Sequence, residues 1–351
     1  MELNSLLDDI TKPNILTLLP TYKCTARCKE CCFCSSPELK DRIPKEVILE
    51  TIRSTKASFP SLQLVVFSGG ECFLLKDDLF ECIALASDLG LSTRCVTNAY
   101  WGKNEAKAKQ VASKLKHAGI SEINISTGVE HSEWISIDTV LNASMALVEE
   151  NIFVVVTIEK DVKGSNFTKA FRRNPKYIDI EFNPNFEAKS NSWMAFTDSP
   201  LDRGSLENKD NIKQKCDQLY KNIVVTPHRL VSSCCGLTFE YQPEMIIGNL
   251  DTEKIKDIYR SQSTDLLKMA ISSIGPYELS KMVYGDNKEF IKKLSNSNHL
   301  CEVCLLFSRE EKSKGRFLEK IKNANFKNMI INSFVINQKT KSSGILNEKS
   351  N

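Results

Sequence analysis

The sequence of 351 residues contains 41% hydrophobic and 26% charged residues, which is ordinary for a folded globular protein. Its net charge of +3 is too small and too evenly spread to favour a protein that binds nucleic acid. No stretch approaches the ~20 apolar residues needed to cross a bilayer, and the start of the chain lacks the basic and apolar parts of a secretory signal. We therefore expect a cytoplasmic protein with no membrane or nucleic-acid partner.

In chain order, residues 15–182 alternate apolar, strand-like runs with helical patterns. In the first helical pattern, a proline stands at a plausible first helical position, and Val47, Ile48 and Ile52 share one helix face. This alternation predicts an α/β fold with a parallel sheet and right-handed crossovers. The expected strands are Ile15–Pro20, Gln63–Ser68, Ser92–Thr97, Glu122–Thr127, Ile152–Ile158 and Tyr177–Phe182, and the expected helices are Pro44–Ala57, Asp77–Leu89, Asn104–Ala118, Ile137–Glu150 and Phe167–Arg173.

After about residue 200 the pattern changes to shorter elements. We expect a short strand pair at Asn222–Thr226 and Arg229–Ser233, and then a run at Ile246–Leu250 with a helix from Thr252. The Lys-rich end of the chain is typical of a solvated helix or a disordered tail. The expected organisation is an N-terminal extension (1–14), a main domain (15–200), a second domain (201–310) and a tail (311–351).

Thirteen cysteines favour metal binding or catalysis over a disulfide framework in a long intracellular chain. The first group has the spacing Cys24-x3-Cys28-x2-Cys31, directly after the first expected strand. A four-iron cluster normally takes four thiolates, so a loop with three leaves one iron open to an amino-acid-like ligand. Structural zinc sites instead pair Cys-x2–4-Cys knuckles into closed tetrahedra, which makes zinc the weaker alternative here. Cys32 and Cys34 fit small buried hydrophobic residues better than ligands.

Gly69-Gly70-Glu71 ends the second expected strand, and with the cysteine triplet it resembles the radical S-adenosylmethionine (radical SAM) superfamily. The resemblance implies a partial (β/α)6 barrel and a [4Fe-4S] cluster on the triplet, with S-adenosylmethionine (SAM) as cofactor. Many members carry an aromatic residue before the third cysteine, but this chain has Glu30 there, and Phe33 is expected to substitute for it. For Asn98 and Ser126, the alternative is that their side chains only stabilise a turn or cap a helix. The residues implied to contact SAM are Ser68, Gly69, Gly70 and Glu71 at its amino group, Asn98 and Ser126 at its ribose or carboxylate, and Phe33 at its adenine.

The second group of cysteines resembles the SPASM or twitch extensions of radical SAM enzymes that act on peptides, which hold auxiliary [4Fe-4S] clusters. The resemblance implies one auxiliary cluster, and therefore two clusters in the chain. A structural zinc on the same ligands is the alternative. The expected ligands are Cys216, Cys234, Cys301 and Cys304.

Cys235 remains outside both ligand sets, next to Cys234. The layout as a whole resembles the YydG-type peptide epimerases. That implies maturation of a ribosomal peptide: a 5′-deoxyadenosyl radical removes a Cα hydrogen from an L-residue, and Cys235 returns a hydrogen to the opposite face. It also implies a flavodoxin or ferredoxin as reductant. For Cys235 the alternatives are a buried apolar role and an exchange with Cys234 as the cluster ligand. For the protein they are a peptide crosslinking enzyme that uses the auxiliary cluster as oxidant, and a metal-stabilised binding module without activity.

Overall fold

The computed structural model describes residues 11–191, 202–203, 209–235 and 242–348. The chain divides into two compact units. The first, called the barrel unit below, comprises residues 14–204 and 224–230. The second, called the C-terminal unit, comprises residues 1–13, 205–223 and 231–351. Each unit has its own core and is described separately.

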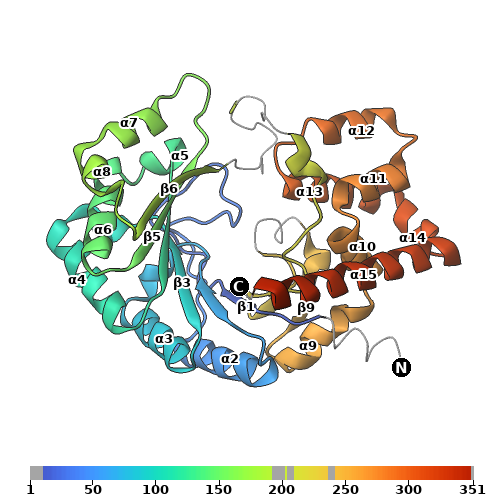
Figure 1. Ribbon diagram of the computed structural model, residues 1–351, viewed down its shortest axis with the longest axis horizontal. Helices are drawn as coiled ribbons and strands as arrows, with labels where there is room; N and C mark the ends of the chain where they lie inside the picture. The colour runs from blue at the N-terminus through green and yellow to red at the C-terminus, as the bar shows by residue number, and fades with distance from the viewer. Residues whose placement is uncertain (1–10, 192–201, 204–208, 236–241, 349–351) are drawn as a thin grey trace. The chain divides into compact units, whose positions relative to one another are not determined.

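A sheet of six parallel strands forms the centre of the barrel unit (Figure 1). The strands pair in the order of the chain, as successive βα units require, and their apolar side chains are largely buried. This arrangement confirms the predicted α/β partial barrel. The strands are β1 (Ile15–Leu18), β2 (Leu64–Phe67), β3 (Ser92–Thr97), β4 (Glu122–Thr127), β5 (Phe153–Glu159) and β6 (Phe186–Asn191).

The crossover helices line the outer side of this sheet (Figure 1). The helices α4 and α6 begin at side-chain caps: Asn104 accepts a hydrogen bond from the backbone N–H of Lys107, and Ser136 accepts one from that of Thr139. These caps fix where the chain leaves the sheet edge and turns back. The helices are α2 (Lys45–Ser58), α3 (Asp77–Asp88), α4 (Glu105–His117), α5 (Val129–Ser132), α6 (Ile137–Glu149), α7 (Phe167–Arg173) and α8 (Pro175–Ile180), with 3-10 turns η1 (Cys72–Leu75) and η2 (Tyr100–Lys103).

The expected strand at Tyr177–Phe182 is wrong. Most of that range lies in α8, and the sixth strand follows it as β6. The side chain of Asn174 caps the helix by accepting a 3.0 Å hydrogen bond from Lys176 N, and Pro175 occupies the first turn. Tyr177 and Ile180, three residues apart, are buried, as the spacing of a helix face requires. The helix-start signals therefore outweigh the apolar run.

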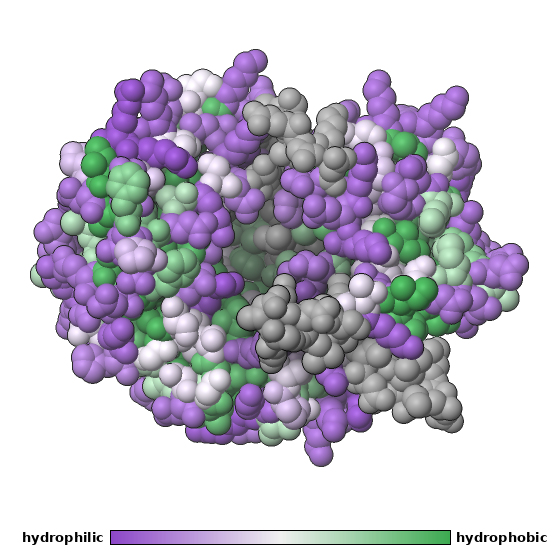
Figure 2. Space-filling model, viewed as in Figure 1, coloured by the Kyte–Doolittle hydropathy of each residue, from purple (hydrophilic) through white to green (hydrophobic). Residues whose placement is uncertain are grey.

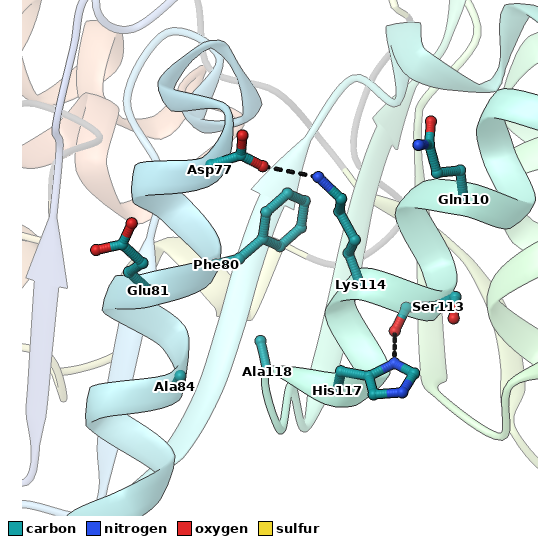
Figure 3. Close-up of a pocket in the computed structure, with 9 residues that line it drawn as sticks. All are labelled: Asp77, Phe80, Glu81, Ala84, Gln110, Ser113, Lys114, His117 and Ala118. Atoms are coloured by element: carbon teal, nitrogen blue, oxygen red, sulfur yellow. Dashed lines mark hydrogen bonds and ion pairs between the residues drawn. The ribbon is translucent and has the colours of Figure 1, made fainter.

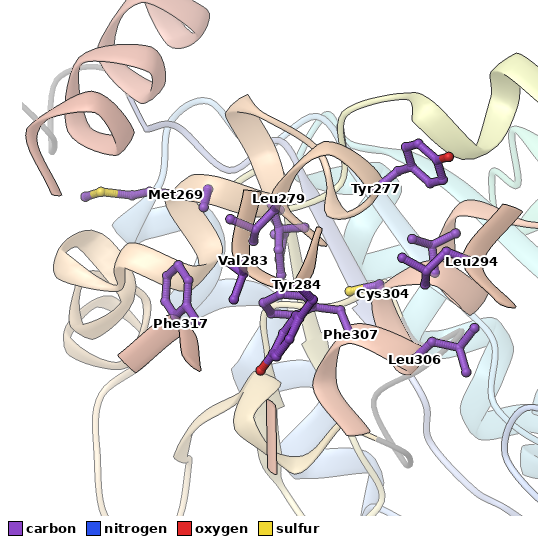
Figure 4. Close-up of a cluster of buried hydrophobic side chains, with 14 of the residues drawn as sticks. Met269, Tyr277, Leu279, Val283, Tyr284, Leu294, Cys304, Leu306, Phe307 and Phe317 are labelled. Atoms are coloured by element: carbon purple, nitrogen blue, oxygen red, sulfur yellow. The ribbon is translucent and has the colours of Figure 1, made fainter. Parts of the chain in front are cut away.

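The C-terminal unit is mainly helical around its own hydrophobic core (Figure 4). Tyr284 and Phe307 meet edge to face at 6.0 Å between ring centroids, and Phe307 meets Phe317 at 6.2 Å. The expected strand pair is present as β7 (Asn222–Val225) and β8 (Leu230–Ser232), and the expected run is present as β9 (Ile246–Asn249). The helices are α9 (Ile255–Ser261), α10 (Leu266–Ser273), α11 (Pro276–Tyr284), α12 (Lys288–Ser295), α13 (Leu300–Lys314), α14 (Arg316–Lys320) and α15 (Ala324–Glu348), which forms the Lys-rich end.

Polar and charged side chains cover most of the outer helices on the face seen in Figure 2. Large apolar side chains with high exposure are few and scattered among the described residues, as is usual for a folded protein. None of the helices described here is both long and apolar enough to cross a membrane.

Candidate functional site

The loop between β1 and α2 carries Cys24, Cys28 and Cys31. Its backbone is held by hydrogen bonds from Cys24 N to Ser36 O, at 3.1 Å, and from Cys31 N to Cys28 O, at 3.3 Å. Burial raises the pKa of the Cys28 thiol, and the neighbouring Cys31 and Cys24 thiols raise it further. The structure therefore brings the three expected ligands together in one loop.

The same burial bears on how this loop binds metal. It raises the pKa of the Cys24 thiol to about 12, with a further contribution from the Glu71 carboxylate. Thiols bind metal as thiolates, so iron must displace these protons, and loading depends on pH. A donor set of three thiols fits a [4Fe-4S] cluster with one open iron. Among the residues described, no group of three or more His, Cys, Asp or Glu side chains is arranged so that it could hold a single metal ion.

Gly69 and Gly70 join the end of β2 to the cysteine loop. Gly70 N donates a 2.8 Å hydrogen bond to Thr21 O, and Glu71 N donates one of 2.9 Å to Lys23 O. A Cβ on Gly70 would lie 2.2 Å from Lys23 O, and Gly69 has φ +101°, a conformation that favours glycine. Only glycine lets the two backbones approach so closely, which leaves a side-chain-free cradle beside the thiols.

Glu71 points into the protein interior and organises the next strand end. Its carboxylate accepts hydrogen bonds from Phe73 N at 3.0 Å, Asn98 N at 2.9 Å and Thr97 Oγ1 at 2.9 Å. Burial nevertheless raises its pKa to about 7. Asn98 in turn points its Nδ2 toward the Cys24 Sγ at 3.6 Å. The expected cofactor residues Glu71 and Asn98 thus lie beside the thiol loop.

A buried group of charges that the sequence analysis missed lies on the other side of the loop. Arg203 donates hydrogen bonds to Glu30 Oε2 at 2.8 Å, Glu159 Oε2 at 3.4 Å and Lys160 O at 2.7 Å. Glu130 accepts one from Glu30 N at 2.9 Å, and its own N donates to Glu159 Oε1 at 2.6 Å. Glu130 follows the end of β4, and Glu159 is the last residue of β5, so their positions at strand ends could have marked them in the sequence. Arg203 is 173 residues from Glu30, and no sequence pattern indicates their contact.

Among the polar atoms of this region, Glu130 Oε1, Thr127 Oγ1 and Arg203 Nε are buried without a hydrogen-bond partner in the described structure. An unpaired buried carboxylate oxygen is costly, so it indicates a donor that is supplied from outside the chain. Hydroxyl groups of a nucleoside have that chemistry, and SAM carries two on its ribose. The half-buried Ser126 immediately precedes Thr127. These residues fit the expected cofactor.

Phe33 lies in the same loop, two residues after Cys31. Its ring stacks on Tyr22, with the ring centroids 6.1 Å apart and the planes at 24°. Glu30, at the position where the resembled superfamily often has an aromatic residue, is 2% exposed and paired with Arg203. The structure therefore shows why an acid is accommodated there. It leaves the expected role of Phe33 as a prediction.

Five of the thirteen cysteines lie in the C-terminal unit, namely Cys216, Cys234, Cys235, Cys301 and Cys304. Cys304 belongs to the hydrophobic core (Figure 4), and Cys216 and Cys234 pack against that core. Burial raises the pKa of Cys304, and Cys216 and Cys234 raise it further. The adjacent Cys234 thiol and burial raise the pKa of Cys235, and Cys301 and Cys216 add to the shift. Cys301 and Cys304 lie on one helix, α13, whereas Cys216, Cys234 and Cys235 come from other segments of the unit.

A groove of about 720 Å³ runs between α3 and α4 on the outside of the barrel unit (Figure 3). Lys114 pairs with Asp77 at 2.7 Å and lies over the Phe80 ring, 5.4 Å from its centroid. The groove contains none of the expected site residues. Its lining residues are Asp77, Phe80, Glu81, Ala84, Gln110, Ser113, Lys114, His117 and Ala118.

Comparison with known proteins agrees with this geometry. Residues 18–132 match the family model of the radical SAM superfamily. The putative peptide biosynthesis protein YydG of Bacillus subtilis (strain 168) is 28% identical over 147 residues, which are 41% of this chain and 46% of YydG. The PqqA peptide cyclase of Bradyrhizobium diazoefficiens is 35% identical over 122 residues, which are 34% of this chain and 30% of the cyclase. The chain therefore spans less than half the length of either relative.

Solved structures share the fold at low sequence identity. The structure described as native anSMEcpe with bound AdoMet and Cp18Cys peptide has a TM-score of 0.53 and 11% identity, and the match covers 91% of this chain and 99% of that chain. The structure of native anSMEcpe with bound AdoMet has a TM-score of 0.54 and 12% identity, with 89% and 100% covered. At such identities the likeness shows a common fold.

Proposed function

Because residues 18–132 are a radical SAM domain, we propose that the protein is an enzyme that reductively cleaves SAM and uses the resulting radical chemistry to modify a ribosomally made peptide. The observation that carries the proposal is the thiol loop joined to the Gly69-Gly70 cradle, beside buried polar atoms that lack partners. The peptide part rests on the two curated relatives, whose names refer to peptides.

In this proposal Cys24, Cys28 and Cys31 hold a [4Fe-4S] cluster, which supplies the electron for SAM cleavage when it is bound. The backbone from Ser68 to Glu71 positions the SAM amino group, since no Cβ intervenes there. Asn98, Ser126 and the free oxygen of Glu130 contact the polar groups of SAM.

We further propose that Cys216, Cys234, Cys301 and Cys304 hold an auxiliary [4Fe-4S] cluster, and that the product is a D-residue. In this proposal Cys235, which follows the ligand Cys234 and lies outside the ligand set, carries the thiol that donates the hydrogen. Removal of a Cα hydrogen from an L-residue leaves a planar radical, and Cys235 returns one hydrogen atom to the opposite face. The balance is then neutral for the peptide, and the thiyl radical left on Cys235 takes up one proton and one electron from the external reductant. A bound auxiliary cluster would relay that electron.

A second candidate function is peptide crosslinking, which the likeness to a PqqA peptide cyclase favours. Here the substrate radical loses one electron and one proton as a bond forms within the peptide, and a bound auxiliary cluster would be the electron acceptor. The product is therefore two hydrogens lighter than the substrate. Cys235 then has no role as a hydrogen donor. The two functions thus differ in the mass of the product.

Anaerobic reconstitution with iron and sulfide tests the common part of both functions. We expect two [4Fe-4S] clusters per chain, and 5′-deoxyadenosine on reduction in the presence of SAM. Zinc alone, or SAM that stays intact after reduction, would overturn the proposal.

Turnover of a peptide substrate in heavy water separates the two outcomes. Epimerisation predicts one deuterium at the altered Cα, because a thiol hydrogen exchanges with solvent. The Cys235→Ala variant should keep both clusters and still cleave SAM, but yield no D-residue. The matched control is Cys82→Ala, which removes a buried thiol on α3 of the barrel unit and should still invert the substrate. A Cys235→Ala enzyme that still inverts the substrate would show that another group donates the hydrogen, whereas a product two hydrogens lighter would favour crosslinking.

A further inference from the structure

Gln242 in the C-terminal unit contacts one of the expected ligand thiols. Its side chain is 1% exposed. The amide Nε2 lies 3.0 Å from Cys304 O and 3.2 Å from Cys304 Sγ. One buried amide therefore meets both the backbone and the thiol of the same cysteine.

The orientation of this amide follows from its partners. A backbone carbonyl can only accept hydrogen bonds, so the NH2 end of Gln242 must face Cys304 O. That nitrogen has two hydrogens, and the second is left to point at Cys304 Sγ. The flipped amide would set two oxygens against each other. Gln242 is thus a donor toward the Cys304 sulfur at 3.2 Å, and its Oε1, 3.6 Å from the same sulfur, can accept the proton of the Cys304 thiol before metal binds.

Asn98 offers a comparison in the barrel unit. Its Nδ2 lies 3.6 Å from Cys24 Sγ and also donates to Thr25 Oγ1 at 3.0 Å. The amide of Gln242 is closer to its thiol, and both of its hydrogens go to Cys304. Gln242 therefore holds its cysteine more firmly than Asn98 holds Cys24.

We propose that Gln242 is a positioning residue that fixes Cys304 as a metal ligand and, through its N–H···S hydrogen bond, raises the reduction potential of the cluster bound there. This inference rests on the auxiliary cluster proposed above. Reduction adds negative charge to a cluster and its sulfur ligands, and a donor at the sulfur stabilises that charge. The effect is strong in a buried site, because little water competes for the sulfur.

Such a residue affects either proposed reaction. The auxiliary cluster must accept an electron from a substrate radical in crosslinking, and must pass one on in epimerisation. Its potential decides how readily each transfer occurs. Gln242 would thus adjust the second half of the reaction without contacting the peptide.

The test uses the full chain with Cys24→Ala, Cys28→Ala and Cys31→Ala, so that only the auxiliary cluster remains for a redox titration followed by EPR. Gln242→Leu is added to this background to remove the donor at similar volume, and Gln242→Glu to replace the donor by a carboxylate. The matched control is Gln262→Leu, since Gln262 is a buried glutamine of the same unit whose side chain has no hydrogen-bond partner in the described structure.

We expect Gln242→Leu to lower the equilibrium constant for reduction of the cluster about tenfold, which lowers the midpoint potential by about 59 mV for one electron. Gln242→Glu should lower the midpoint potential further. Gln262→Leu should match the parent. Faster iron loss to a chelator from Gln242→Leu, but not from Gln262→Leu, would support the positioning role. Equal potentials in the parent and Gln242→Leu, with iron retained, would overturn the Gln242 inference alone. A parent that binds only zinc would overturn the auxiliary cluster as well.

Discussion

At the scale of single residues, the buried Glu71 links three segments: its backbone N–H donates to Lys23 O of the cysteine loop, and its carboxylate binds the η1 turn and the end of β3. Its two oxygens are both acceptors: Oε1 receives the Phe73 N–H, and Oε2 receives the Asn98 N–H. A glutamine has the same shape but must place an NH2 group against one of these donors. Position 71 therefore requires a side chain with two acceptor oxygens, and a polar side chain of the same size does not suffice.

We predict that Glu71→Gln lowers the free energy of unfolding by about 1–3 kcal/mol, the usual cost of an unsatisfied buried donor. Urea denaturation of the metal-free protein measures this change. Glu50→Gln on an exposed position of α2 is the control and should change stability by less than about 0.5 kcal/mol. Equal stability of wild type and Glu71→Gln would contradict the role of both oxygens.

The barrel unit also contains a matched pair of histidines, one buried and one exposed. His131 is 7% exposed, and burial, with the nearby Arg203 charge, lowers its pKa to about 4 from an ordinary 6.5. Between these values the unfolded chain binds a proton that the folded protein does not. Stability from this residue is therefore present above pH 6.5 and is lost as the pH falls toward 4.

We predict that His131 lowers the free energy of unfolding of the wild type by about 3 kcal/mol as the pH falls from 6.5 to 4. His131→Gln should show a correspondingly weaker fall in stability over the same range. His117→Gln, on the exposed end of α4, should keep the pH dependence of the wild type. Denaturation curves at several pH values compare the three proteins. Identical pH profiles for His131→Gln and the wild type would contradict the effect of burial.

At the scale of elements, the sequence was sufficient wherever periodicity and end signals agreed. The first five strands and the strand pair β7 and β8 lie within a residue or two of their expected positions. The range Tyr177–Phe182 failed because a short apolar run has no period that separates a buried strand from a helix. Asn174-Pro175 was the missed signal for a helix start.

The cap of α8 gives a direct test of that explanation. We predict that Asn174→Ala destabilises the protein by about 1 kcal/mol, because it removes the acceptor of the Lys176 N–H. Asn166→Ala is the control, since Asn166 precedes α7 in the same way but makes no side-chain cap hydrogen bond. Thermal denaturation of both variants measures the difference. A larger loss in Asn166→Ala than in Asn174→Ala would mean that the cap does not determine this helix.

At the scale of the whole molecule, local spacing was enough to find the two cysteine groups but not the charges around them. Cys24, Cys28 and Cys31 share one loop, so their proximity follows from eight consecutive residues of chain. Glu30, Glu130, Glu159 and Arg203 meet only after the barrel unit has folded, and no local pattern connects them. Gln242 and Cys304 are likewise 62 residues apart. Contacts of this kind follow from tertiary structure alone.

The two cysteine sets lie in different compact units and share no ligand. We therefore predict that the triple variant Cys24→Ala, Cys28→Ala, Cys31→Ala loses cleavage of SAM but retains about four irons per chain, the number in one [4Fe-4S] cluster. The complementary variant with alanine at Cys216, Cys234, Cys301 and Cys304 should retain the other cluster and some cleavage of SAM, because the barrel unit keeps its own core. Iron counting and 5′-deoxyadenosine analysis on both variants measure this independence. Complete loss of iron from a folded triple variant would show that the two sites depend on each other.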